Sequence, residues 1–110
     1  MLANERMEHV NKVQFKAPTK PPVIEFDQSV GAWYLRFREG KVARTISEDK
    51  PGYVTAIDLD AHNQVVGLEL IGVRELTINW LKKAAPMDVS GIDFDNAIFV
   101  PAASREFAEA

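Results

Sequence analysis

Cysteine is absent from the 110 residues of this chain, so disulfides, thiolate metal sites and cysteine nucleophiles are excluded. Proteins without disulfides suit reducing compartments, and we expect a cytoplasmic location. Long apolar runs are absent too, since none approaches the ~20 residues of a membrane span. The opening MLANERMEHV lacks the apolar core of a secretory signal. We therefore expect a soluble protein with no membrane partner.

An excess of positive charge is absent, because 16 acidic residues outnumber 13 basic ones and the formal net charge is −3. Domains that bind the phosphates of nucleic acids are usually basic. One cluster of basic and aromatic residues on two predicted strands has the chemistry to stack single-stranded nucleic acid, but the acids of the next hairpin oppose it. This cluster is Tyr34, Arg36, Arg38, Lys41 and Arg44. We expect no nucleic acid as the primary partner.

Catalytic motifs are missing as well. The two histidines, His9 and His62, match no metal-binding spacing. The serines lie in predicted turns or loops, and none has the glycine-flanked setting of a hydrolase nucleophile. The sequence therefore predicts no catalytic residue, no metal ligand and no cofactor.

The composition is that of a globular protein, with 46% hydrophobic and 26% charged residues. We predict a flexible N-terminal arm at residues 1–22, where the run APTKPP opposes both helix and central strand. A single α+β domain is expected at residues 23–101, with a fraying C-terminus at residues 102–110. In an alternative, the arm exchanges onto a partner through Val13 and Phe15.

Five short runs between Val23 and Gly72 mostly alternate apolar with polar residues, as antiparallel strands with one buried face do. Their connections are shorter than the about a dozen residues that a parallel crossover needs. The predicted strands are Val23–Phe26, Ala32–Arg38, Lys41–Ile46, Tyr53–Leu59 and Val65–Ile71. We predict an α+β fold, an antiparallel β-meander of four to five strands with one C-terminal helix packed on it.

The register is best defined for the last two strands. One register puts their large apolar residues on one face, with Asn63 in a left-handed turn position. It pairs Leu59 with Val66, Ile57 with Leu68, and Thr55 with Leu70. For the third strand, pairing straight back across Gly40 sets Arg44 opposite Leu35 on the core face. We expect instead a bulge at Gly40 that turns Arg44 outward.

The hydrophobic period changes after residue 72. Thr77 fits the N-cap of a helix, and the lysines near residue 83 suit its C-terminal end. We predict a helix from Thr77 to Ala85 that packs Trp80 and Leu81 on the sheet. A strand is the alternative, because apolar residues also alternate between positions 76 and 80. Ala97–Val100 is expected to form a short extra strand.

Asp58, Asp60 and Glu69 form the carboxylate cluster with a shared predicted face. In one interpretation they bind a hard divalent cation or act as acid and base, which would make a small enzyme or a metal-dependent site. In the preferred interpretation they form surface ion pairs with arginines of neighbouring strands. That ion-pair cluster is Arg36, Arg38, Arg44, Asp58, Asp60 and Glu69.

Apolar residues remain on the second face of the sheet once the core face is assigned. Apolar and charged residues mixed on one surface are typical of a protein interface. The predicted partner interface is Tyr34, Arg36, Val54, Val65 and Ile71. Isologous pairing of this face predicts a homodimer. The alternative is a monomer in which residues 86–101 cover the face.

The segments Val-Ala-Arg-Thr at residues 42–45 and Val-Val-Gly-Leu-Glu at residues 65–69 carry a recognisable pattern. With the runs around them, from Val23 to Gly72, they resemble the bacterial family called domain of unknown function 2283. Two positions differ: Asn63 stands where that family usually has glycine, and Gly31 where aspartate is common. The resemblance implies a small β-rich fold and supplies no catalytic residue.

Some members of that family lie beside toxin-like genes, so the resemblance implies an antitoxin-like role with a toxin-like protein as partner. Residue pattern and resemblance together favour a non-enzymatic protein-interaction module that is self-associating or antitoxin-like.

Overall fold

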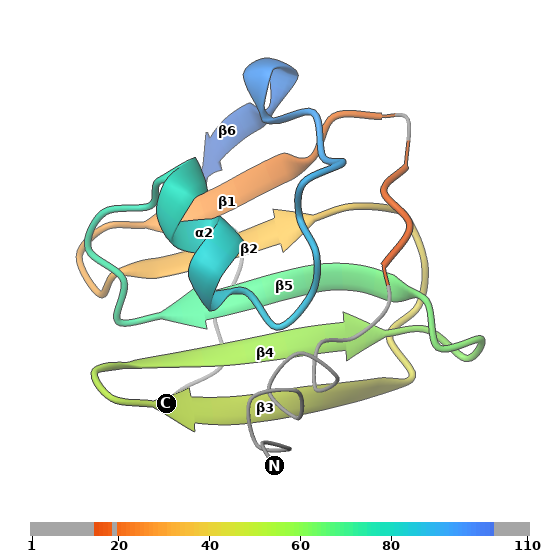
Figure 1. Cartoon of the computed structure of the whole chain (residues 1–110), viewed down its shortest axis with the longest axis horizontal. Coiled ribbons are helices and arrows are strands. Elements are labelled where there is room, and N and C mark those ends of the chain that lie inside the picture. Colours follow the sequence, from red (N-terminus) through yellow and green to blue (C-terminus); the bar gives the residue numbers. More distant parts are fainter. Residues whose placement is uncertain (1–14, 19, 103–110) are drawn as a thin grey trace, which may run out of the picture.

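Within the described residues, a six-stranded sheet carries one α-helix on one of its faces (Figure 1). The computed structural model describes residues 15–18 and 20–102. Its elements are β1 (Val23–Asp27), β2 (Ala32–Arg36), β3 (Arg44–Lys50), β4 (Tyr53–Leu59), β5 (Val65–Ile71), α2 (Ile78–Ala84), the 3-10 helix η1 (Phe94–Asn96) and β6 (Ile98–Pro101). The fold is α+β, and its sheet has six strands instead of the predicted four to five.

The strand order is β3-β4-β5-β2-β1-β6, whereas a meander would make β2 and β3 neighbours. β2 pairs with β5, which sets Trp33 opposite Leu70 and Leu35 opposite Leu68. Residues 37–43 therefore pass the ends of β5 and β4 before β3 begins, a distance of three strand spacings or about 14 Å. Strands β2 to β5 have a Greek-key order, so the predicted meander is wrong at this connection.

The expected tight hairpin at Gly40 is also wrong, because β2 and β3 are not paired. Arg44 opens β3, lies opposite Leu59 of β4 and is exposed, so it neither faces Leu35 nor depends on a bulge at Gly40. β3 lies later in the chain than the predicted Lys41–Ile46. Its pairing with β4 continues to the turn at residues 51–52, which defines where the strand ends.

β6 pairs with β1 in parallel, so the sheet is mixed and not antiparallel throughout. The Ile98 N–H donates to the Pro22 carbonyl at 3.0 Å, and the Ala102 N–H donates to the Phe26 carbonyl at 2.9 Å. The short extra strand predicted at residues 97–100 therefore exists. It covers β1, which leaves β3 and β6 as the two edges of the described sheet.

The β4–β5 hairpin confirms most of the predicted register. Ile57 lies opposite Leu68, and Thr55 lies opposite Leu70. The register then shifts by one residue, so that Leu59 meets Val65 and not Val66. Such a bulge turns a side chain to the other face of the strand. Val65 consequently joins the hydrophobic core, with 2% of its surface exposed. Asn63 has the expected left-handed backbone, with φ of 65°.

α2 begins where the sequence predicts. The Thr77 hydroxyl accepts a hydrogen bond from the Trp80 N–H at 3.1 Å, as an N-cap does. The helix and the chain that follows it lie over β1, β2 and β5 (Figure 1). Leu81 is the helix residue that enters the core, where it is 1% exposed. Trp80 is only partly buried, and its ring meets Tyr53 edge-on with 5.1 Å between centroids.

The described part of the predicted N-terminal arm packs on the domain. Phe15 contacts Phe37 with 5.0 Å between ring centroids, and the Lys16 carbonyl accepts a hydrogen bond from Arg38 at 2.9 Å. Residues 1–14, 19 and 103–110, which hold the rest of the predicted arm and the predicted fraying end, lie outside the described residues. In the described ranges, no helix combines the length and apolarity needed to cross a membrane.

We predict that Leu81→Ala destabilises the protein by about 2–5 kcal/mol, as other buried leucine truncations do. Ile78→Ala is the matched control, because Ile78 lies on the same helix and is 43% exposed. Its cost should stay within about 0.5 kcal/mol. Urea unfolding measures both variants. Equal costs for the two would contradict the docking of α2 through Leu81.

Candidate functional site

A row of polar residues crosses the face of the sheet opposite α2, which we call the back face. Pairing places Thr45 of β3 opposite Asp58 of β4, and Asp58 opposite Gly67 of β5. Gly67 in turn lies opposite Arg36 of β2. Four strands therefore contribute to one row. Of these residues, the sequence pattern assigned Arg36 and Asp58 to the predicted ion-pair cluster and left Thr45 and Gly67 unassigned.

Tyr34 organises the back face. Its hydroxyl donates to Asp58 Oδ2 at 2.8 Å, while the Thr45 hydroxyl donates to Asp58 Oδ1 at 2.6 Å. The phenol ring crosses β5 at Gly67, where a Cβ atom would overlap the tyrosine oxygen and ring. Tyr34 is 1% exposed as a result. The carboxylate of Asp58 thus connects β2 and β3, which are not adjacent in the sheet.

Charged groups surround this tyrosine. The guanidinium carbon of Arg36 lies 5.3 Å from the centre of the Tyr34 ring, within the range of a cation–π interaction. Glu69 of β5 and Glu25 of β1 lie directly opposite Tyr34 on its two sides. Glu69 is buried despite its charge. The centre of the back face is therefore a packed polar layer instead of an open apolar surface.

The residues of the predicted partner interface are divided between core and back face. Val65 belongs to the hydrophobic core because of the β5 bulge, and Tyr34 is buried over Gly67. Arg36, Val54 and Ile71 are half-buried. Two of the five predicted contact residues therefore have almost no surface to offer a partner. Sequence alternation alone could not show either effect, since a bulge and a ring lying on a neighbouring strand are tertiary features.

The three acids of the predicted cluster do not converge. Both oxygens of Asp58 accept hydrogen bonds from Tyr34 and Thr45. Asp60 lies in the β4–β5 loop, where its Oδ1 accepts the N–H groups of His62 at 2.8 Å and Gln64 at 2.9 Å. Among the described residues, no group of three or more acids and histidines has the arrangement of a metal site.

Two arginines of the predicted ion-pair cluster, Arg38 and Arg44, donate to neutral acceptors. Arg38 donates to the Val65 carbonyl at 3.1 Å and to the Gln64 side chain at 3.3 Å. Arg44 donates to Asn63 Oδ1 at 2.7 Å from one nitrogen and at 3.3 Å from another. Arg38 and Arg44 thus bind backbone and amide oxygens of the β4–β5 hairpin. The sequence had predicted that they bind carboxylates such as those of Asp58 and Asp60.

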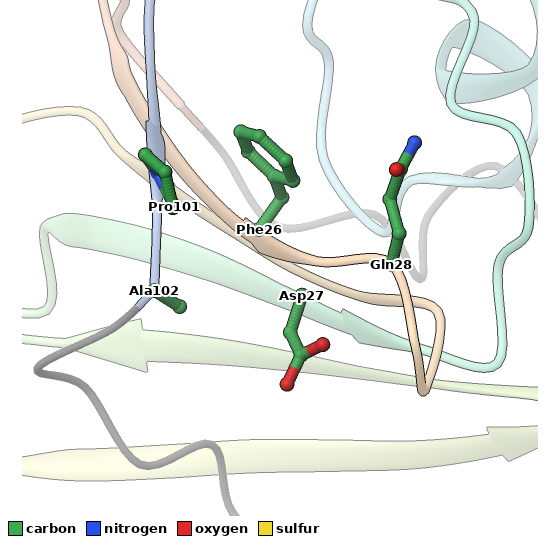
Figure 2. A pocket seen from close by; sticks show the side chains of 5 residues that line it. All are labelled: Phe26, Asp27, Gln28, Pro101 and Ala102. Carbon is green, nitrogen blue, oxygen red and sulfur yellow. The ribbon is translucent and has the colours of Figure 1, made fainter.

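A shallow open hollow of about 330 Å³ lies between the end of β1 and the end of β6. Its lining is Phe26, Asp27, Gln28, Pro101 and Ala102. Phe26 and Asp27 point to opposite sides of β1 (Figure 2). Asp27 Oδ1 accepts hydrogen bonds from the N–H and hydroxyl of Ser29. Asp27 is the one titratable residue in the described part of the lining, so these residues supply no acid–base pair for catalysis.

The edge at β3 has the longest run of exposed residues among the described strands. Among the described strands β3 pairs with β4 alone, and residues 44–49 are all exposed. Ile46, in the middle of the strand, is 41% exposed although the Ile57 opposite it is buried. We call the side of β3 that faces away from β4 the open edge. Sequence reasoning missed it, because the meander placed this strand inside the sheet.

The second edge, at β6, is protected by proline. The N–H groups of Ile98 and Ala102 point to β1, so the alternate residues Phe99 and Pro101 direct their backbone outward. Proline has no N–H, and edges with proline resist the addition of another strand. Exposed Ile98 and Phe99 side chains therefore lie beside a backbone with few donors to offer.

Comparison of the chain with protein-family models, curated proteins and solved structures gave no match. The resemblance to domain of unknown function 2283 therefore stays a prediction. Function is inferred from the geometry of the back face and the open edge.

We predict that Gly67→Ala costs about 1–3 kcal/mol, because the added methyl group overlaps the Tyr34 ring and overpacking of this kind is destabilising. In a Tyr34→Ala background the same substitution should cost almost nothing, because the ring is gone. A double-mutant cycle in urea measures this coupling. Additive costs would show that Tyr34 does not lie over Gly67.

Backbone hydrogen bonds make Asp60 a pH-sensitive group of the hairpin. The Gln64 N–H, with a smaller contribution from the His62 N–H, holds the pKa of the Asp60 carboxyl below its usual range. An unfolded aspartate has a pKa of about 3.9. Stability from Asp60 is therefore present above about pH 4 and is lost as the pH falls through the folded pKa.

Asp60→Asn should accordingly weaken the loss of stability below about pH 4, because asparagine keeps the hydrogen-bond acceptor without the titration. Urea unfolding over a series of pH values measures this slope, and carboxyl NMR locates the pKa. A wild-type Asp60 that titrates at or above the ordinary aspartate pKa would contradict the prediction.

Proposed function

We propose that this chain is a non-enzymatic protein-interaction module whose binding surface is the open edge of β3. The observation that carries the proposal is an edge strand with six consecutive exposed residues and an exposed isoleucine at its centre. The unpaired backbone of such a strand offers donors and acceptors to an added strand, and its side chains provide specificity.

The contrast between the two edges supports this choice. Folded proteins protect sheet edges with proline, charged side chains or a covering helix, and of these β3 has only charged side chains. β6 carries Pro101 at its end, whereas β3 has no proline between its bounds, and α2 lies over the other half of the sheet (Figure 1). An apolar side chain in the middle of an accessible edge is a liability unless a partner covers it.

The edge is a better binding surface than the back face that the sequence suggested. Tyr34 and Val65 are buried there, so isologous packing of the back face would gain little apolar contact. On the open edge, Ile46 is 41% exposed, and Val42, two residues before β3, is exposed to the same extent. We therefore propose that self-association uses the open edge instead of the back face. A toxin-like partner would add its strand at the same edge.

Catalysis by the carboxylates is the weaker alternative. Asp58 is held by two donors, and Asp60 is bound within its own loop. The net charge of −3 continues to favour a protein over a nucleic acid as partner. These features support interaction, not chemistry, as the role of the described surface.

We predict that Ile46→Lys abolishes association through the open edge, because lysine in the middle of an edge strand opposes further pairing. Ile78→Lys is the matched control, since Ile78 is 43% exposed on α2 and lies away from the edge. Sedimentation equilibrium over a concentration series measures association, and circular dichroism verifies folding. Association that survives Ile46→Lys, or is lost equally in Ile78→Lys, contradicts the proposal.

A further inference from the structure

We propose that the partner of the open edge is a second copy of this chain, paired β3 to β3 in an antiparallel register centred on Ile46. A two-fold axis through this point would join two six-stranded sheets into one continuous sheet. The inference rests on the proposed function of the open edge and adds the identity and register of the partner.

Symmetry limits which residues can meet across the edge. An antiparallel pair related by a two-fold axis has that axis perpendicular to the sheet, so both copies keep their core-facing sides together. The core-facing residues of β3 lie opposite core-side residues of β4. They are Arg44, Ile46, Glu48 and Lys50. In the dimer these residues can lie opposite only one another, which leaves few registers.

Charge selects among these registers. With Ile46 opposite Ile46 of the second copy, Arg44 lies opposite Glu48 of the second copy, and symmetry repeats this pair. A shift to Ser47 as the centre sets Arg44 opposite Lys50, which is repulsive. A shift to Thr45 sets Arg44 opposite Ile46. Opposite charges across a strand pair stabilise it and like charges destabilise it, so the register centred on Ile46 is favoured.

The two charged residues are available for this pairing. Arg44 is exposed, and its Nε and Nη2 atoms donate to the neutral Asn63 side chain. A guanidinium has five N–H donors, so the Nη1 side still has donors for a carboxylate. Glu48 exposes 54% of its side chain and contacts Lys50 through Oε2 at 3.1 Å. Arg44 of the second copy would add to this contact.

Ile46 would continue the hydrophobic core across the axis. It lies opposite Ile57, which is 1% exposed within the core cluster, and it shares the same side of the sheet. Contact with Ile46 of the second copy covers the apolar surface that the edge leaves in water. Val42, the other exposed apolar residue of this region, would lie opposite Lys50, whose alkyl chain can cover it.

Charge exchange tests the pairing of Arg44 with Glu48. Arg44→Glu and Glu48→Arg should each lose the dimer seen for the wild-type chain in sedimentation equilibrium, because each places like charges together twice. An equal mixture of the two variants should form a heterodimer, and the double variant should regain the homodimer. Arg74→Glu and Glu75→Arg are matched controls, since both residues are exposed outside the edge. These controls should dimerise like the wild type.

Cysteine cross-linking tests the register in a chain that has no cysteine of its own. Ile46→Cys places two sulfurs directly opposite each other, at a Cα separation of about 4.5–5.5 Å that a disulfide spans. It should form a covalent dimer under mild oxidation. Ser47→Cys should not do so alone, because its partner in this register is Thr45. Mixed Thr45→Cys and Ser47→Cys chains should cross-link to each other.

The outcomes separate this inference from the proposed function. The register centred on Ile46 is wrong if Ser47→Cys cross-links in preference to Ile46→Cys, or if the mixture of Arg44→Glu and Glu48→Arg chains stays monomeric. In either case, loss of association in Ile46→Lys would still show that the open edge is the binding surface. A wild-type chain that stays monomeric across the series overturns the second copy as partner. A different protein, such as a toxin-like one, could then bind in a way that Ile46→Lys abolishes. That result would support the open edge as the binding surface and contradict the homodimer.

Discussion

The hydrogen bond between Tyr34 and Asp58 is the interaction on which the strand order depends. It reaches from β2 over Gly67 of β5 to β4, and Thr45 of β3 donates to the same carboxylate. A side chain at position 67 would fill the space of the ring, so only glycine lets β2 lie beside β5 in this way. With β2 held there, β3 has a described neighbour on one side only. The accessible edge of β3 thus follows from the pairing of β2 with β5, which this polar contact across Gly67 supports.

Local signals in the sequence predicted local structure well. Thr77 marked the start of α2, and the alternation around Asn63 gave the β4–β5 hairpin with the correct pairing of Ile57 and Leu68. Both features depend on residues close in the chain. The pairing of β2 with β5 and the parallel addition of β6 to β1 join distant segments, and periodicity carries no information on such choices. The predicted meander and its edges were wrong for that reason.

The candidate site was predicted less well than the fold. The interface expected on the back face required Val65 to point away from the core, but one bulge in β5 reverses it. The acids and arginines were expected to pair with one another, but the hydrogen bonds of Arg38, Arg44 and Asp58 go to hydroxyl, amide and backbone groups. Exposure of Ile46 could be recognised only after the strand order was known. Its location, at the centre of an edge with opposite charges on either side, is what links the fold to interaction.

Amide hydrogen exchange of β3 tests the central claim most directly. In an edge strand, the alternate amides that point away from β4 exchange rapidly unless another strand accepts their hydrogen bonds. The account predicts that these amides around Ile46 become protected as the protein concentration rises, while the Phe99 amide at the β6 edge does not change. Outward β3 amides that exchange at the same rapid rate at every concentration, with no partner able to protect them, would contradict the open edge as a binding surface.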